Sequence, residues 1–397
     1  MTDKGQTTIK TLADRPDRRV AAVTKRVWRS LTAAIVLLAA LLTAGAAPAS
    51  ASGTVFVNEG ESIQAAIDAA DPGTRIIVKG DHVENLWITT DGITLQGNNA
   101  TLTAPAEPTP VPPPCQNFED PSAVALICVL PSTWSSFEEA PATRINGVNI
   151  TGFTLNNSGF DGISIAFADG VRVTDNTIPA PGCDGIFVIF GTKVQVNRNT
   201  VTDAGCSGIG VVASSNARIQ QNVTNGSFGN GIAVNDTSRV VVHRNTATGN
   251  CIGIGVVDGA DGGFGFLPEE VDGSIARVSN NVTNANNRTC PFGPEAVVGG
   301  TGIIVGGVTN LAVTNNTANG NTIDGNSLTA GGIFIGDFPN QDGSTSVGDN
   351  VRVANNSAEG NSSAAGPVDL VLATAGNNVR VTNNSCSFGA PDPSLCN

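Results

Sequence analysis

The 397-residue chain contains no tyrosine, a single methionine and only 14% charged residues, whereas it has 47 glycines and 21 prolines. Glycine and asparagine disfavour helices, and the valine and threonine that recur along the chain suit a pleated strand. An all-α protein is therefore excluded. Because 40% of the residues are apolar, the chain can bury a core, which argues against wholesale disorder. The formal net charge of −13 argues against a nucleic-acid partner.

Only the N-terminal part of the chain contains a long apolar run. Basic residues between positions 15 and 29 precede the uncharged run 31–44, and small residues continue to Ala51. This order is typical of a secretory signal peptide, and the run is short for a membrane span. We predict a signal peptide over 1–51, with an uncleaved N-terminal anchor as the alternative. The mature chain is then predicted to be secreted or held at the cell surface, monomeric and without a membrane span.

One asparagine recurs in the same local setting along the chain. It follows a short strand with alternating apolar residues, and a strand opened by Gly-Ile comes a few residues later. The first three intervals are 23 residues, and the positions are Asn176, Asn199, Asn222, Asn245, Asn281, Asn316, Asn356 and Asn384. Two earlier coils fit the pattern, with Asn98 in one and Phe153 at the asparagine position in the other. A repeat of this length without a helix is typical of a parallel β-helix; the alternative, a leucine-rich horseshoe, needs regular leucine, which is scarce here.

Stacked coils would place equivalent asparagines about 4.8 Å apart, the spacing of neighbouring strands. Each side-chain amide can then bond its neighbour and the turn backbone. Since a buried amide must find partners at every level, we interpret this column as scaffold rather than as a binding site. Before the first coil, Ile63, Ala66, Ile67 and Ala70 fall on one helical face, which predicts a short amphipathic capping helix.

The alternating strand, the Asn turn, the Gly-Ile strand and the opening segment 61–78 together resemble the pectate-lyase-like superfamily. The resemblance covers about residues 54–386. It implies an all-β, right-handed parallel β-helix of about ten coils with a short N-terminal capping helix, formed by a single domain over 52–397. Within it we predict a proline-rich inserted loop over 103–143 and a C-terminal tail over 387–397. The same coil carries lyases, hydrolases, epimerases, adhesins and noncatalytic proteins, so the resemblance alone does not give the activity.

Insertions interrupt the period beside the Gly-Ile strand near 257–272, 286–300, 321–331 and 336–350. We expect them to form the walls of a groove along that strand, or to be tolerated surface loops. The eight cysteines all lie in the mature chain, which suits an oxidising compartment. Cys183 and Cys206 are 23 residues apart and should form a disulfide between neighbouring coils. Sequence order suggests three further pairs: Cys115 with Cys128, Cys251 with Cys290, and Cys386 with Cys396.

A column of polar residues precedes the Gly-Ile strands, namely Asp161, Asp184, Ser207 and Asn230. Two stacked aspartates at about 5 Å separate their pKa values and can divide acid and base work. In polygalacturonase-like hydrolases, which this column resembles, a histidine and a third carboxylate follow. Here Ser207 replaces the histidine, and Asp203 is the candidate third carboxylate. We therefore predict Asp161, Asp184 and Asp203 as catalytic residues, the alternative being ordinary turn residues.

Phe187 and Phe334 are predicted to face outward on the groove strand, where they could stack on a sugar ring. With Ser207 and Asn230 they are the candidate substrate-binding residues. A lyase would instead need a basic residue and calcium, and one outward strand face does carry arginines: Arg172, Arg218, Arg277, Arg352 and Arg380. No acidic calcium cluster faces them, so we interpret them as solvated.

The sequence indicates no metal site and no cofactor, and calcium is compatible with it but not indicated. His82 and His243 should lie about five coils, or ~24 Å, apart, too far to share a metal. We predict that the protein recognises an extracellular or cell-wall polysaccharide along the groove, and whether it also cleaves the chain stays open between a hydrolase and a lyase. The alternative is a noncatalytic surface or structural β-helix that displays loops to a protein partner.

Overall fold

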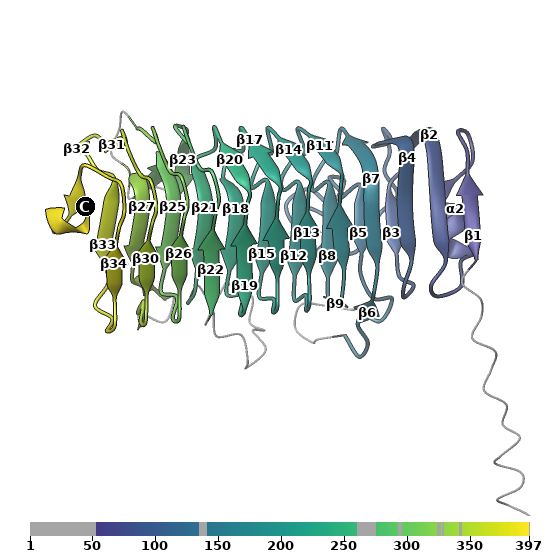
Figure 1. Cartoon of the computed structure of the whole chain (residues 1–397). Coiled ribbons are helices and arrows are strands. Elements are labelled where there is room, and N and C mark those ends of the chain that lie inside the picture. The colour runs from purple at the N-terminus through teal and green to yellow at the C-terminus, as the bar shows by residue number, and fades with distance from the viewer. Residues whose placement is uncertain are drawn as a thin grey trace, which may run out of the picture. The chain divides into compact units, whose positions relative to one another are not determined.

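The computed structural model describes residues 53–134, 141–259, 275–292, 296–323, 327, 329–340 and 344–396. The predicted signal peptide lies outside the described residues. The regular secondary structure of the described chain is almost entirely β-strand, in short strands wound into coils that stack along one axis (Figure 1). The chain forms a right-handed parallel β-helix, as predicted. No helix in the described part of the chain is long and apolar enough to cross a membrane.

Two long parallel sheets make up the stack. The first, sheet A, has 16 strands: β1 (Thr54–Val57), β2 (Arg75–Val83), β4 (Thr94–Thr103), β7 (Asn149–Asn156), β10 (Arg172–Thr174), β11 (Thr177–Pro179), β13 (Gln195–Asn197), β14 (Thr200–Thr202), β16 (Arg218–Gln220), β17 (Val223–Asn225), β19 (Val240–His243), β20 (Thr246–Thr248), β22 (Ala276–Ser279), β26 (Ala312–Thr314), β30 (Arg352–Ala354) and β34 (Arg380–Thr382).

Sheet B has 11 strands: β3 (Leu86–Ile88), β5 (Ile127–Val129), β8 (Ile163–Ala166), β12 (Ile186–Ile189), β15 (Ile209–Val212), β18 (Asn230–Asn235), β21 (Ile252–Val257), β25 (Thr301–Gly306), β27 (Gly331–Gly336), β33 (Leu370–Ala373) and β35 (Gly389–Ala390). Four small pairs lie outside these sheets: β6 (Ile145–Asn146) with β9 (Ala168–Asp169), β23 (Thr289–Phe292) with β24 (Ala296–Gly299), β28 (Phe338–Pro339) with β29 (Thr345–Ser346), and β31 (Ser362–Ser363) with β32 (Gly366–Pro367).

The 23-residue period keeps every coil in register with the next. Val173 pairs with Val196, which pairs with Ile219, and all three point into the core. Their neighbours in each strand point outward, because successive side chains of a strand alternate between its two faces. The sequence period therefore decides both which residues are buried and which residues share an outer surface.

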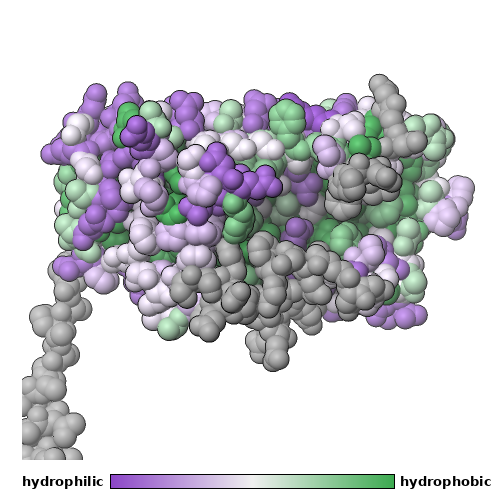
Figure 2. Space-filling view, turned by 180° about the vertical axis from the view of Figure 1, so that it is seen from behind, coloured by the Kyte–Doolittle hydropathy of each residue, from purple (hydrophilic) through white to green (hydrophobic). Residues whose placement is uncertain are grey.

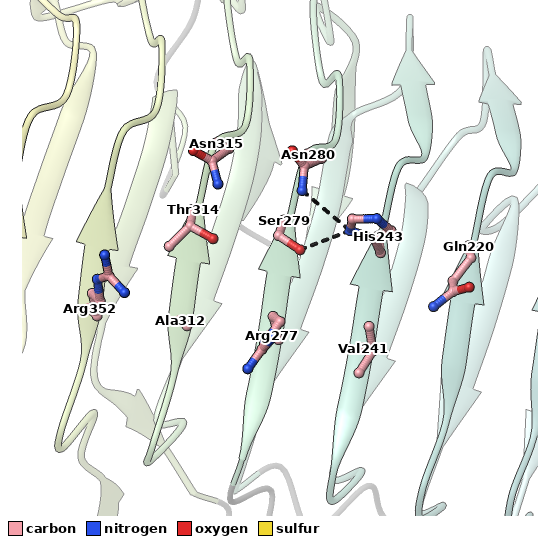
Figure 3. Close-up of a pocket in the computed structure, with 10 residues that line it drawn as sticks. All are labelled: Gln220, Val241, His243, Arg277, Ser279, Asn280, Ala312, Thr314, Asn315 and Arg352. Atoms are coloured by element: carbon pink, nitrogen blue, oxygen red, sulfur yellow. Dashed lines mark hydrogen bonds between the residues drawn. The ribbon is translucent and has the colours of Figure 1, made fainter.

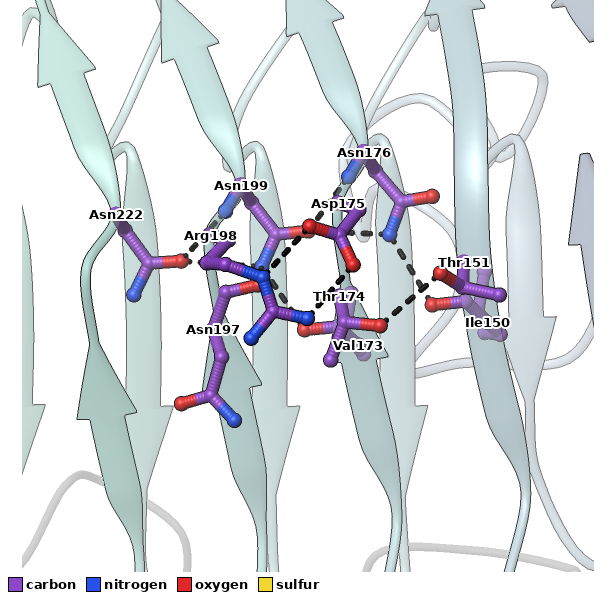
Figure 4. Close-up of polar contacts among 10 residues, drawn as sticks. All are labelled: Ile150, Thr151, Val173, Thr174, Asp175, Asn176, Asn197, Arg198, Asn199 and Asn222. Carbon is purple, nitrogen blue, oxygen red and sulfur yellow. Dashed lines mark hydrogen bonds and ion pairs between the residues drawn. The ribbon is translucent and has the colours of Figure 1, made fainter. Parts of the chain in front are cut away.

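The asparagines stack in the turn between two strands of sheet A (Figure 4). The backbone N–H of Asn199 donates to Oδ1 of Asn222 at 2.9 Å, and its Nδ2 donates to the carbonyl of Val173 at 2.9 Å. The preceding Arg198 has a φ of 55°, the left-handed conformation that turns the chain. The same bonds repeat from Asn176 to Asn384, which we call the first asparagine column.

The first two coils differ from the prediction at Asn98. The strand register places Ala100, not Asn98, beside Phe153. Asn98 lies in an irregularity of β4 between Gln96 and Ala100 and is exposed. The column begins instead where Asn176 Oδ1 accepts the backbone N–H of Phe153, because the buried Phe153 and Ala100 fill the core at this end with apolar atoms.

A second column of asparagines, not predicted from the sequence, stacks five residues after the first. It begins where Oδ1 of Asn250 accepts the backbone N–H of Ser227, and Asn250 in turn donates to Asn286. The column continues through Asn321 and Asn361 to Asp369, whose carboxylate accepts from Asn361. It supports the turns of the coils that carry the longer insertions.

The first coil is capped by the short helix α2 (Ile63–Asp68), as predicted. Ser62 caps its N-terminus by accepting the N–H of Ala65. Ile63 and Ile67 are buried against the first coil, so the helix covers a core that would otherwise meet solvent. The other end carries the one-turn η1 (Pro393–Leu395).

The predicted insertion 103–143 is divided by a strand of the coil itself. Residues 127–129 form β5, which pairs with β3 and β8 in sheet B. The segments before and after it are therefore two separate loops. Side chains of the first loop, among them Val111 and Cys115, pack on Phe167 and Phe190 in a hydrophobic cluster outside the coil. This loop thereby covers the outer face of the first strands of sheet B.

Four disulfides join the pairs that the sequence suggested: Cys115 with Cys128, Cys183 with Cys206, Cys251 with Cys290, and Cys386 with Cys396. Cys183 and Cys206 lie on neighbouring coils with their Cα atoms 4.4 Å apart. Every one of these bridges ties an insertion, a turn or the C-terminal tail to the coil stack.

Gly185, which precedes β12, lies where neighbouring coils pack closely, so replacing it tests this packing. A Cβ atom on Gly185 would lie 2.4 Å from Cγ1 of Val201 and 2.6 Å from the carbonyl of Gly208. We therefore expect Gly185→Ala to lower the free energy of unfolding by about 2–3 kcal/mol, measured by chemical denaturation. The control is Gly53→Ala, whose Cβ would have no neighbour within 4 Å. Equal stability of the two variants would contradict this packing.

Candidate functional site

The structure brings Asp161 and Asp184 together on the outer side of sheet B. They stand just before β8 and β12, on neighbouring coils, and both side chains are buried. The backbone N–H of Asp184 donates to Oδ1 of Asp161 at 3.0 Å, and the N–H of Ser207 donates to Oδ1 of Asp184 at 2.6 Å. Each carboxyl group is thus held by the backbone of the following coil, which fixes its position.

Burial governs the protonation of this pair. It raises the pKa of Asp161 well above its usual range, and the nearby charge of Asp184 raises it further, against the opposing hydrogen bond from the Ser164 hydroxyl. Burial also raises the pKa of Asp184 to about 7, against the opposing N–H of Ser207. The two carboxyl groups consequently keep at least one proton between them near neutral pH.

A small cavity of about 150 Å³ opens beside the pair. Its wall is mainly apolar and is lined by Pro114, Phe118, Phe160, Asp161, Cys183, Asp184, Phe187 and Ile189. Pro114 and Phe118 come from the loop before β5, whereas the others come from the coils. The cavity is therefore formed where that loop meets the stack.

Three of the four carboxyl oxygens of the pair accept hydrogen bonds, which leaves Oδ2 of Asp184 without one among the described residues. Both oxygens of Asp161 accept hydrogen bonds, and so does Oδ1 of Asp184. Oδ2 of Asp184 lies over Gly210 of the next coil, 3.0 Å from where a Cβ would be. Since this oxygen belongs to a group whose pKa is near neutrality, it can donate or accept a proton at physiological pH.

Asp203 lies apart from this pair. It follows β14 in an exposed turn, and its carboxylate is 3.8 Å from Nη2 of Arg288. It does not line the cavity. The proposed third carboxylate therefore faces an arginine of a later coil rather than Asp161 and Asp184.

The predicted aromatic residues lie in one outward column on sheet B, which continues beyond Phe187 to Trp87 and beyond Phe334 to Val371. Phe187 and Phe334 are both half-buried and lie five coils apart, about 24 Å. Between them the column contains mostly small residues, Gly210, Ala233, Gly255 and Ile304. A low floor between two aromatic rings suits an extended ligand. Figure 2 shows the back of the molecule, where apolar residues lie among hydrophilic ones and hydrophilic residues gather along the upper edge.

Ser207 and Asn230 continue the column that begins with Asp161. Both are half-buried. Ser207 offers its backbone to Asp184, as described, and Nδ2 of Asn230 lies 2.7 Å from where a Cβ on Gly255 would be. The glycines of the floor thus leave room for the polar side chains of the preceding coil.

The predicted groove walls are only partly described. Parts of these walls lie outside the described residues, namely 260–274, 293–295, 324–326, 328 and 341–343. The walls that are described include the hairpins β23–β24 and β28–β29. Phe118, Phe160 and Ser164 are site residues that the repeat did not single out; Ser164 alone had a signal, because it stands three residues after Asp161 in the same strand segment.

The two sulfurs nearest to Asp184 cannot act as thiolate ligands in this state. Ligand atoms of Cys183, Asp184 and Cys206 lie within 4.8 Å of one another, but the cysteines are joined in a disulfide. A metal would need free thiolates there. The group therefore belongs to the scaffold of the cavity.

Comparison with known proteins identifies the fold. Residues 142–266 match the family model described as "Right handed beta helix region". The A-module of the mannuronan C-5 epimerase AlgE4 from Azotobacter vinelandii is similar in structure, with a TM-score of 0.56 and 15% identity over 82% of this chain and 91% of that one. A search by sequence among curated proteins finds no significant match.

A mutant tailspike protein of Escherichia coli bacteriophage HK620, in complex with a pentasaccharide, has a TM-score of 0.51 and 13% identity, over 91% of this chain and 59% of that chain. At these identities the likeness concerns the fold. The chain accordingly has a right-handed parallel β-helix fold.

Proposed function

We propose that the protein recognises an extracellular or cell-wall polysaccharide on the outer face of sheet B, with Asp184 as the group that exchanges a proton with the sugar. The observation that carries the proposal is the carboxyl group of Asp184, one oxygen of which accepts no hydrogen bond from a described residue, in the wall of an apolar cavity lined by aromatic rings. Apolar ring faces suit the C–H faces of a sugar, and a carboxyl group with a pKa of about 7 suits general acid catalysis.

Two further observations support this proposal. The epimerase named above acts on mannuronan, and the tailspike was determined with a pentasaccharide bound. The four disulfides agree with an oxidising compartment, so we propose that the chain is secreted and meets its ligand outside the cytoplasm.

Asp161 has a positioning role in this scheme. Both of its oxygens are occupied, and it holds the backbone of Asp184 in place. Its proximity also contributes to keeping a proton on the pair. A binding protein without turnover is the second candidate, because among the described residues that line the cavity only Asp184 has a carboxyl oxygen that accepts no hydrogen bond.

The test is a glycan array combined with reducing-end and unsaturated-product assays on the mature protein, with and without calcium. We expect the wild type to bind at least one glycan. If it also cleaves that glycan, Asp184→Asn should lower kcat by roughly 10²–10⁴-fold while binding is kept, since the amide preserves shape but not acidity. Asp175→Asn, far from the cavity in the ion pair with Arg198, is the control.

The assays separate the outcomes. Binding without turnover by the wild type selects the second candidate. Absence of binding to a broad panel would sink the polysaccharide proposal as a whole and favour the display of loops to a protein partner. Unchanged turnover in Asp184→Asn would show that Asp184 does not act in catalysis.

A further inference from the structure

An alternating column of arginines runs along the outer face of sheet A, away from the site on sheet B. Strand pairing sets Arg172 beside Gln195 and Gln195 beside Arg218. The column continues through Val241, Arg277, Ala312, Arg352 and Arg380. From Arg172 to Arg352, every second coil thus carries an arginine, and an uncharged, shorter side chain lies between. We call Arg172, Arg218, Arg277 and Arg352 the arginine comb.

The four comb arginines form no ion pair with a carboxylate among the described residues. All four side chains are exposed, and none is in an ion pair with a described residue, whereas Arg144, Arg198 and Arg288 are. The strands that carry the comb contain no acidic residue. In a chain with a net charge of −13, this face concentrates unpaired positive charge. Because screening limits the reach of distant charges to about 8 Å in physiological salt, a ligand on this face meets mainly the comb.

Hollows lie between the arginines. One of about 310 Å³ opens over Val241, between Arg218 and Arg277. Another of about 450 Å³ opens over Ala312 beside Arg352 and extends past Arg277 to Val241 and Gln220. Figure 3 shows the second hollow, with Arg352 at one border, Arg277 in its middle, and hydroxyl and amide groups around them. Those groups include Ser279, Asn280, Thr314 and Asn315. They are hydrogen-bonding partners that suit the hydroxyl groups of a sugar.

The distance between successive comb arginines indicates which class of ligand fits this face. Neighbouring coils are about 4.8 Å apart, so successive comb arginines lie about 9.6 Å apart, which is close to the length of one disaccharide in an extended chain. A guanidinium group binds a carboxylate with two parallel hydrogen bonds. No phenylalanine, tyrosine or tryptophan is among the described residues that line either hollow, and the one imidazole, His243 in the second hollow, is hydrogen-bonded to Ser279. The large stacking platforms that single-stranded nucleic acids use are therefore missing from these two hollows.

We propose that the arginine comb binds a linear polysaccharide that carries a carboxylate on every second sugar. The carboxylates pair with the arginines, and the uncharged sugars lie over Val241 and Ala312. This site is separate from the one proposed on sheet B, and it needs neither Asp161 nor Asp184.

The first test is calorimetric titration with a hyaluronan decasaccharide, in which glucuronate alternates with an uncharged sugar. We expect Arg218→Ala/Arg277→Ala/Arg352→Ala to weaken binding roughly 10- to 100-fold, since each exposed charge pair contributes modestly and three are removed. The control removes the same charge from three arginines that are in ion pairs, with Arg144→Ala/Arg198→Ala/Arg288→Ala, and should change the affinity less than about twofold. Methyl esterification of the decasaccharide should abolish binding. Equal binding by the comb variant, or by the ester, would overturn the proposal.

A second variant separates a fitted site from a merely positive surface. Val241→Arg/Ala312→Arg adds charge but fills both hollows, so we expect weaker hyaluronan binding; a general electrostatic surface would bind it more tightly, which would overturn the proposal. Two competing ligands extend the test: polygalacturonate, which is charged on every sugar, and single-stranded DNA. If either binds the wild type more tightly than hyaluronan does, the proposal is overturned. Asp184→Asn should leave comb binding unchanged, so failure here and failure of the sheet B proposal are distinguishable.

Discussion

Replacing Asn222 by leucine is expected to lower the free energy of unfolding by about 3–6 kcal/mol, because several buried polar groups lose their partners at once. The Asn222 Oδ1 accepts both the backbone N–H and the side-chain Nδ2 of Asn199. Its own Nδ2 donates to the carbonyl of Val196 at 2.8 Å and to Asn245. Leucine provides neither the acceptor nor the donor in a turn where water cannot replace them. Denaturant unfolding monitored by circular dichroism measures the effect.

Asn197→Leu is the matched control. Asn197 is an asparagine of the preceding coil, and its half-buried side chain projects outward from β13, away from the column (Figure 4). We expect a change within about 0.5 kcal/mol, as for most surface substitutions. If Asn222→Leu is no more destabilising than this control, the first asparagine column does not stabilise the coils.

The second large effect is a pH dependence of stability that originates in Asp184. Its pKa is about 7 in the folded chain against an ordinary aspartate value of about 3.9, so the folded state holds the proton more tightly than the unfolded state. Its contribution is fully present below about pH 4 and is lost as the pH rises through 7. The free energy of unfolding should therefore fall by on the order of 4 kcal/mol across that window. In Asp184→Asn the fall should be smaller, with a remainder that comes from Asp161.

Unfolding at several pH values between 4 and 8 measures this dependence, with Asp175→Asn as the comparison. The hydrogen bond from Arg198 lowers the pKa of Asp175, so its contribution has the opposite sign and is lost as the pH falls. Because this pair is exposed, the effect should be small. Parallel pH profiles for the wild type and Asp184→Asn would show that Asp184 is not held protonated by the fold.

The sequence predicts the coil well wherever the repeat is regular. The 23-residue interval fixes the register from Asn176 to Asn245, and with it the stacking of Asp161 and Asp184. Prediction was less successful where the period changes. The second asparagine column went unrecognised because its intervals are long and unequal, although each member stands five residues after a member of the first. The short strand β5 was missed because a proline-rich segment surrounds it.

Side-chain surroundings that depend on irregular loops could not be read from the period. Phe118 reaches the cavity through the loop before β5, whose path no repeat specifies. The separation of Asp203 from the pair has a similar cause, since its partner Arg288 comes from an insertion. The alternation of the arginine comb was visible in the sequence, but the hollows between its members, and the lack of partners for its charges, became apparent only in the structure.

The central feature of this account is a buried carboxyl pair that keeps a proton near neutral pH beside an aromatic cavity. Carbon-13 NMR of the side-chain carboxyl groups of aspartate, titrated from pH 3 to 9 and assigned with Asp161→Asn and Asp184→Asn, tests it most directly. The structure predicts that the Asp184 resonance titrates with a midpoint of about 7 and that Asp161 also titrates well above the usual range. Midpoints near the ordinary aspartate value of about 4 for both groups would contradict it.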